Sequence, residues 1–275
     1  MLGLGLGLNK NTALKKYALD YIPGAYESCV AFFSYYQPSA KYKDELCRIK
    51  RLDTGTEKDI GPVNGYIEDS AVSSFCTGTT GLVTTIYNSS SAAGKQNAIQ
   101  TTPANMPIIY EGGAFLSDGF KFVAANSKGM NITTYTDLNI LNPPLSLYAN
   151  YYKSNISNGF IFSKFQEFEL FSYASGGVTY ATFRLADYQR NGDIQEANPS
   201  ANKFIATWKD RNANGLLSRV NTNTAVNTFA GNITNINNVY IGYRASSNYH
   251  TGNIKTIAIF NSNQYDNYTE LAALM

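Results

Sequence analysis

The chain has 275 residues, of which 44% are hydrophobic and 15% charged, and its formal net charge is +2 at pH 7. The apolar content is too high for a disordered chain, and the length suits one large all-β domain or two smaller domains. The small net charge, without a run of Lys or Arg, argues against nucleic-acid binding, and no apolar run is long enough to span a bilayer. We therefore expect a globular protein with neither nucleic acid nor membrane as a partner.

The opening of the chain alternates leucine with glycine, at Leu2, Leu4, Leu6 and Leu8. In an extended strand these four side chains project from one side, and an apolar arm of this kind needs a surface to bury it. The opening lacks the basic segment and the cleavage site of a secretion signal. We predict that residues 1–16 are an uncleaved docking arm that adds a strand to a neighbouring subunit, and that residues 17–275 form the domain. A flexible tail, or a tuck against its own domain, also fits the pattern.

Short helices are expected at residues 12–21, 70–76 and 267–274, the first of which is ended by Pro23-Gly24. The cysteines are odd in number and form no CxxC pair, so we expect buried, reduced thiols. They are Cys29, Cys47 and Cys76.

The remainder of the chain has the residue types and the two-residue alternation of strands. Turn signals separate the runs, notably Ser175-Gly176-Gly177 and Asn214-Gly215. Residues 254–260 are apolar on both faces, which is typical of a central strand. The predicted strands are 46–51, 82–87, 168–173, 178–185, 204–208, 216–220, 239–243 and 254–260.

Several short motifs between residues 24 and 113 recur together in one known family. They are Arg48, Lys50-Arg51, Asp53, Asp59-Ile60-Gly61, Phe75-Cys76, Thr84-Thr85, Tyr87, Asn97, Gln100-Thr101-Thr102 and Pro107. In this set the segment resembles the catalytic β-sandwich of fungal α-L-arabinofuranosidase B, a glycoside hydrolase family, and even more the phage virion proteins that carry the same domain.

The second half closes with Ile241-Gly242, then Gly252-Asn253-Ile254 and Ile259-Phe260-Asn261, followed by a short helix. This order is similar to the laminin-G pattern. Together with the strand pattern, the two resemblances imply an all-β fold: a concanavalin-like (jelly-roll) β-sandwich with a few short helices and an extended N-terminal arm.

The resemblance also allows the enzyme hypothesis to be examined, because a retaining glycosidase needs two carboxylates about 5–5.5 Å apart. It implies an acid/base just after Ile241-Gly242, yet residues 243–252 contain no Asp or Glu. It implies a nucleophile near Glu167 or Glu169, which share a strand face with Phe171 and Tyr173, and we expect that pair to face solvent. The sequence therefore predicts a degenerate site and no enzyme activity.

Other chemistry finds little support. His250 is the single histidine and has neither a nucleophile motif nor a second metal ligand beside it, so we interpret it as a loop histidine. Residues 187–196 contain oxygen ligands that calcium favours but lack the EF-hand order. We expect no metal and no cofactor.

These observations favour a non-enzymatic bacteriophage virion structural protein: a head fibre, a capsid decoration or a tail-associated part. We expect it to fold in the host cytoplasm, to form homo-oligomers, and to contact capsid, portal or tail subunits through the leucine arm. One alternative is a carbohydrate-binding receptor-recognition module that touches a host surface glycan. Its predicted contacts are Tyr151, Tyr152, Tyr243, Tyr249 and His250. The second alternative is an active, arabinofuranosidase-like glycoside hydrolase.

Overall fold

The structure is a computed structural model that describes residues 17–133, 143–154, 159–164, 168–175, 178–185, 190–196, 202–209, 215–221, 223–227, 238–245 and 247–275. The predicted docking arm, with Leu2, Leu4, Leu6 and Leu8, lies outside the described residues. So do Glu167 and the side chains of the candidate calcium segment, residues 187–196.

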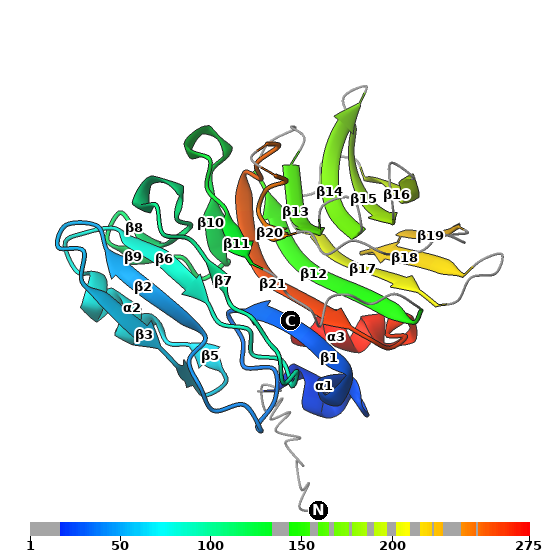
Figure 1. Ribbon diagram of the computed structural model, residues 1–275, viewed down its shortest axis with the longest axis horizontal. Coiled ribbons are helices and arrows are strands. Elements are labelled where there is room, and N and C mark those ends of the chain that lie inside the picture. The colour runs from blue at the N-terminus through cyan, green and yellow to red at the C-terminus, as the bar shows by residue number, and fades with distance from the viewer. Residues whose placement is uncertain are drawn as a thin grey trace, which may run out of the picture.

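The strands form two antiparallel layers (Figure 1). The first layer has the order β1, β21, β12, β17, β18, β19. Its strands are β1 (Cys29–Ser34), β21 (Gly252–Phe260), β12 (Leu145–Lys153), β17 (Asn202–Trp208), β18 (Leu216–Val220) and β19 (Asn223–Asn227).

The second layer has the order β3, β2, β6, β7, β11, β20, β13, β14, β15, β16. Its strands are β3 (Glu57–Ile60), β2 (Cys47–Arg51), β6 (Gly81–Ile86), β7 (Ala98–Ile99), β11 (Met130–Ile132), β20 (Val239–Ile241), β13 (Gly159–Lys164), β14 (Phe168–Ser175), β15 (Val178–Leu185) and β16 (Arg190–Glu196). Near one edge β8 (Ile108–Glu111) and β10 (Phe120–Phe122) connect the layers, because β8 pairs with β6 and β10 pairs with both β8 and β21. The predicted all-β sandwich is confirmed.

The core lies between the layers and is rich in aromatic side chains. Trp208 and Phe204 from the first layer pack with Phe162, Phe168 and Phe183 from the second, and all five are fully buried. The rings of Phe183 and Phe204 meet across the layers with centroids 6.5 Å apart. Truncation of such a ring costs about 3–5 kcal/mol, so these residues account for much of the stability of the sandwich.

Strand β21 is apolar on both faces and lies in the interior of the first layer, between β1 and β12, as predicted. Its Ile257 and Ile259 enter the core between the layers, whereas Ala258 and Phe260 enter a second cluster on the outer face of the first layer. That outer cluster is covered by α3 (Tyr268–Leu274), whose Leu271 is fully buried. Side chains on opposite faces of one strand therefore belong to two separate cores.

The predicted helices at 70–76 and 267–274 are confirmed as α2 (Asp69–Cys76) and α3. Of the helix expected over residues 12–21, the described part is the 3-10 turn η1 (Ala18–Tyr21). All three cysteines are free and buried, as expected. No helix in the described part of the chain is long and apolar enough to cross a membrane. The remaining elements are α1 (Ala25–Ser28), β4 (Pro62–Val63), β5 (Tyr66–Ile67), η2 (Pro103–Asn105), β9 (Ala114–Phe115), η3 (Ala124–Asn126) and η5 (Tyr265–Asn267).

Candidate functional site

A row of polar residues crosses the second layer on the face opposite the core. Strand register places Asn131, Tyr240, Ser163, Glu169 and Arg184 opposite one another on β11, β20, β13, β14 and β15. Residues directly opposite in a sheet project from the same face. Their chain neighbours, among them Ile132, Phe162 and Phe168, enter the core. The polar row is therefore built into the sheet and does not depend on a loop for its position.

Glu169 lies within this row and is fully buried. Its Oε1 accepts hydrogen bonds from Ser163 Oγ and Arg244 Nε, both at 2.7 Å, and its Oε2 accepts one from Arg184 Nη1 at 3.2 Å. A buried carboxylate is costly unless paired and hydrogen-bonded, and here two guanidinium groups compensate its charge. The expectation that Glu169 faces solvent is wrong, because these partners cover it.

Aromatic rings hold the two arginines in place. The guanidinium of Arg184 lies 4.6 Å from the ring centroid of Phe171, and that of Arg244 lies 5.3 Å from the ring of Phe160. The two phenylalanine rings stack on each other with centroids 4.9 Å apart. Cation–π contact and planar stacking suit arginine better than lysine. The arginine side chains are 10% and 16% exposed, so they form the boundary between Glu169 and solvent.

Three half-buried tyrosines continue the site through the segment that supplies Arg244. Tyr240 packs edge-on against Tyr243 with ring centroids 4.8 Å apart, and Tyr243 stacks flat on Tyr249 at 5.2 Å and 7°. Burial raises the pKa of Tyr243, so its hydroxyl stays protonated at neutral pH. Tyrosine combines an apolar face with a polar tip, which suits the apolar faces and hydroxyl groups of a sugar.

The structure separates the five side chains predicted as glycan contacts. Tyr243 and Tyr249 lie together beside Arg244. Tyr151 and His250 are buried, with their rings in an edge-on contact at 6.2 Å, so neither presents a face to a ligand at the surface. Tyr152 is 38% exposed and lines a cavity on the outer face of the first layer, to whose lining Tyr151 also contributes.

His250 lies in the loop before β21, as predicted, and its side chain is fully buried. Its Nε2 donates to the carbonyl oxygen of Tyr152 at 3.1 Å, which leaves Nδ1 as the buried position that a second proton would occupy. Burial, with a smaller contribution from Lys153, lowers the pKa of His250 to about 4. The folded protein therefore keeps this imidazole neutral under mildly acidic conditions.

A loss of stability in acid is expected from this histidine. Between about pH 6.5 and pH 4 the unfolded chain binds a proton at His250 and the folded chain does not, so the free energy of unfolding falls by about 3 kcal/mol as the pH is lowered. Urea unfolding at pH 7, 5.5 and 4 measures the effect. His250→Gln retains a donor for the Tyr152 carbonyl and should lose less stability than the wild type over this range. Equal pH dependence in both proteins would contradict the assignment.

Sequence reasoning missed Ser163, Arg184 and Arg244 as partners of Glu169. The pairing with Arg184 could have been predicted from the sequence. If residues 176 and 177 form a two-residue hairpin loop, Ser175 pairs with Val178, and the same register places Glu169 opposite Arg184. The structure has this register. Within the described residues, no group of three or more His, Cys, Asp or Glu side chains could hold a metal ion.

Comparison with known protein families gives a match over residues 20–136 to the model of the catalytic domain of α-L-arabinofuranosidase B. This confirms the resemblance inferred from the motifs in that segment. A comparison with curated protein sequences gives no match.

Among solved structures, the fold is similar to an arabinofuranosidase in complex with arabinofuranosyl-α-1,2-xylobiose, at 14% identity and a TM-score of 0.64. A GH54 α-L-arabinofuranosidase soaked with a cyclic sulfate inhibitor matches at 13% identity with the same TM-score. Each comparison covers 94% of this chain and 64% of the other, so this chain spans less than two thirds of the length of those enzymes. At these identities the likeness establishes the fold.

These findings correct the expected function. The prediction of a non-enzymatic virion structural protein with a degenerate site is wrong, because residues 20–136 match the model of a glycoside hydrolase catalytic domain. The error began with Glu169, which we placed among solvent-facing strand residues. It is instead a buried, doubly ion-paired carboxylate. The proposed virion partners, oligomeric state and location stay predictions.

Proposed function

We propose that the protein is a glycoside hydrolase of the α-L-arabinofuranosidase type and that Glu169 is its nucleophile. The observation that carries the proposal is the environment of Glu169: a single carboxylate set into a rigid sheet, aligned by Ser163 and charge-compensated by Arg184 and Arg244. The match to a catalytic family supports it for residues 20–136, and the similarity of fold over 94% of the chain extends that support to the layer that holds Glu169.

The proposed reaction uses one of the two carboxylate oxygens of Glu169 as the nucleophile. One oxygen attacks the anomeric carbon, the bond from that carbon to the leaving-group oxygen breaks, and a covalent glycosyl-enzyme forms that water then hydrolyses. Arg184 and Ser163 hold the carboxylate on its strand, which keeps the attacking oxygen in a fixed direction. Tyr240, Tyr243 and Tyr249 supply the neighbouring wall for the sugar ring.

Arg244 has a distinct place in this mechanism. It lies against Glu169 Oε1, so the substrate reaches that oxygen only when the arginine moves aside. Arg244 also occupies the segment in which the family resemblance puts the acid/base, and residues 243–252 contain no Asp or Glu. A leaving group that departs readily as an anion is therefore the appropriate first substrate, because it needs little protonation.

The test is hydrolysis of 4-nitrophenyl α-L-arabinofuranoside by the full chain, followed as release of 4-nitrophenolate. We expect release from the furanoside and none from the 4-nitrophenyl arabinopyranoside, with a shift in intact mass equal to one pentosyl residue during turnover. Failure to release phenolate, together with no covalent adduct at high substrate concentration, would contradict the proposal.

A further inference from the structure

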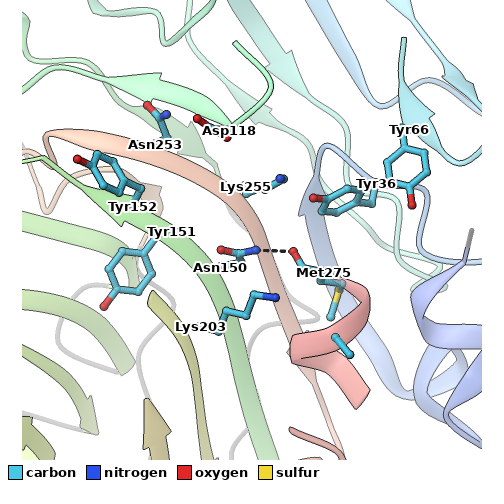
Figure 2. Close-up of a pocket in the computed structure, with 11 residues that line it drawn as sticks. Tyr36, Tyr66, Asp118, Asn150, Tyr151, Tyr152, Lys203, Asn253, Lys255 and Met275 are labelled. Atoms are coloured by element: carbon cyan, nitrogen blue, oxygen red, sulfur yellow. Dashed lines mark hydrogen bonds between the residues drawn. The ribbon is translucent and has the colours of Figure 1, made fainter. Parts of the chain in front are cut away.

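A cavity of about 710 Å³ lies on the outer face of the first layer beside α3 (Figure 2). Along β12 the residues Tyr148 and Asn150 alternate with Leu147 and Ala149, which belong to the core between the layers. Tyr148 lies in the cluster under α3 and Asn150 lines the cavity. Glu169 lies on the outer face of the other layer, so the thickness of the sandwich separates the two sites.

One wall of the cavity is made by polar groups that hold α3 to the sheet. Asn150 Nδ2 donates to the main-chain oxygen of Met275, and Lys203 Nζ donates to the carbonyl oxygen of Ala272. Strand register places Asn150 directly opposite both Lys203 and Thr256. This wall is therefore fixed by both the sheet and the last helix, and the cavity is a preformed feature of the fold.

Aromatic side chains stand at both ends of the cavity. Tyr36 and Tyr66 meet edge-on at one end, with centroids 5.2 Å apart and an interplanar angle of 82°. Tyr152, 38% exposed, stands at the other end, and Asn253 and Lys255 lie between them (Figure 2). Rings at both ends with amide and ammonium groups between them provide apolar faces for sugar rings and hydrogen-bonding partners for hydroxyl groups.

The charges of the cavity favour an anionic ligand. Lys203 and Lys255 line it together with one acidic residue, Asp118. The ammonium of Lys255 lies 5.4 Å from the ring centroid of Tyr36, so a cation and an aromatic ring adjoin within the cavity. Desolvation, and then the neighbouring Lys255, lower the pKa of Lys203. A carboxylate bound between these two lysines would relieve their mutual repulsion.

We propose that this cavity binds an acidic oligosaccharide, one that carries a uronic acid, independently of the site around Glu169. The carboxylate pairs with Lys255, Asn253 contacts hydroxyl groups, and Tyr152 and Tyr36 contact sugar faces. The cavity then holds the protein on an acidic polysaccharide while the opposite face remains open to solvent. Binding in this cavity does not depend on hydrolysis at Glu169.

The test is calorimetric titration of the full chain, at low salt, with a xylo-oligosaccharide that carries one glucuronic acid and with the neutral xylo-oligosaccharide of the same length. We expect the acidic sugar to bind about tenfold more tightly, because its carboxylate adds a charge-assisted hydrogen bond to Lys255. Lys255→Ala should remove this preference, and Tyr152→Ala should weaken both sugars alike. Should Lys255→Ala fold poorly, Lys255→Gln removes the charge with less loss of side chain.

Two controls separate this proposal from the proposed hydrolase function. Lys43→Ala removes the same charge at an exposed residue that does not line the cavity, and it should bind as the wild type does. Glu169→Gln should also bind normally, whether or not the wild type is an active hydrolase. The proposal is overturned by the absence of binding, by equal affinity for the two sugars, or by wild-type binding in both Lys255→Ala and Tyr152→Ala.

Discussion

Glu169→Gln is expected to lower kcat for 4-nitrophenyl α-L-arabinofuranoside at least about 1000-fold, since loss of a nucleophile removes the covalent route altogether. Glutamine keeps the shape of the side chain and can still accept from Ser163 and Arg244 through its carbonyl oxygen. What it loses is the negative charge that attacks the anomeric carbon. The measurement is kcat and KM for wild type and variant on the same substrate.

This substitution needs a folding control, because it also removes the negative charge that faces two largely buried guanidinium groups. Loss of one partner from a buried ion pair costs about 3–5 kcal/mol, so the variant is assayed well below its Tm. Asp59→Asn is the matched surface change: its partner Arg48 is 43% exposed, and the pair contributes about 1 kcal/mol or less. A folded Glu169→Gln protein that retains wild-type kcat would exclude Glu169 as the nucleophile.

Gly252→Ala is expected to destabilise the fold by more than about 4 kcal/mol, enough to unfold a protein of ordinary stability. Gly252 opens β21 with φ of +146°, a conformation that residues with a side chain rarely adopt. A Cβ at this position would lie 2.0 Å from the carbonyl oxygen of Tyr152, which is main chain and cannot rotate away. The start of β21 would have to separate from β12, next to the buried His250.

Gly61→Ala is the matched control for this prediction. A Cβ at Gly61 meets nothing within 4 Å, and its backbone is not in the positive φ region that excludes other residues. Its free energy of unfolding should change by no more than about 1 kcal/mol. Urea unfolding of the three proteins, with circular dichroism of the native baseline, makes the comparison. Similar midpoints for Gly252→Ala and the wild type would show that β12 and β21 do not approach as closely as the structure places them.

The sequence by itself determined the local elements of this protein. The alternation along residues 178–185, the turn signal before them and the two-faced run at 254–260 were sufficient to predict β15, its hairpin with β14, and the central position of β21. Local patterns also predicted the helices α2 and α3, and the motifs between residues 24 and 113 were sufficient to identify the family resemblance. These features depend on neighbours in the chain, so a local pattern contains the information.

Only the tertiary structure decided the environments of the side chains that matter for function. Glu169 is covered by Arg244, which lies far away in the chain. The pairing of β13 with β20 brings these two segments together. His250 is buried, and of the adjacent tyrosines Tyr151 belongs to the core cluster between the layers whereas Tyr152 is 38% exposed. The physical reason is that burial and charge compensation depend on which strands become neighbours across the sheet. No periodicity within one strand records that adjacency.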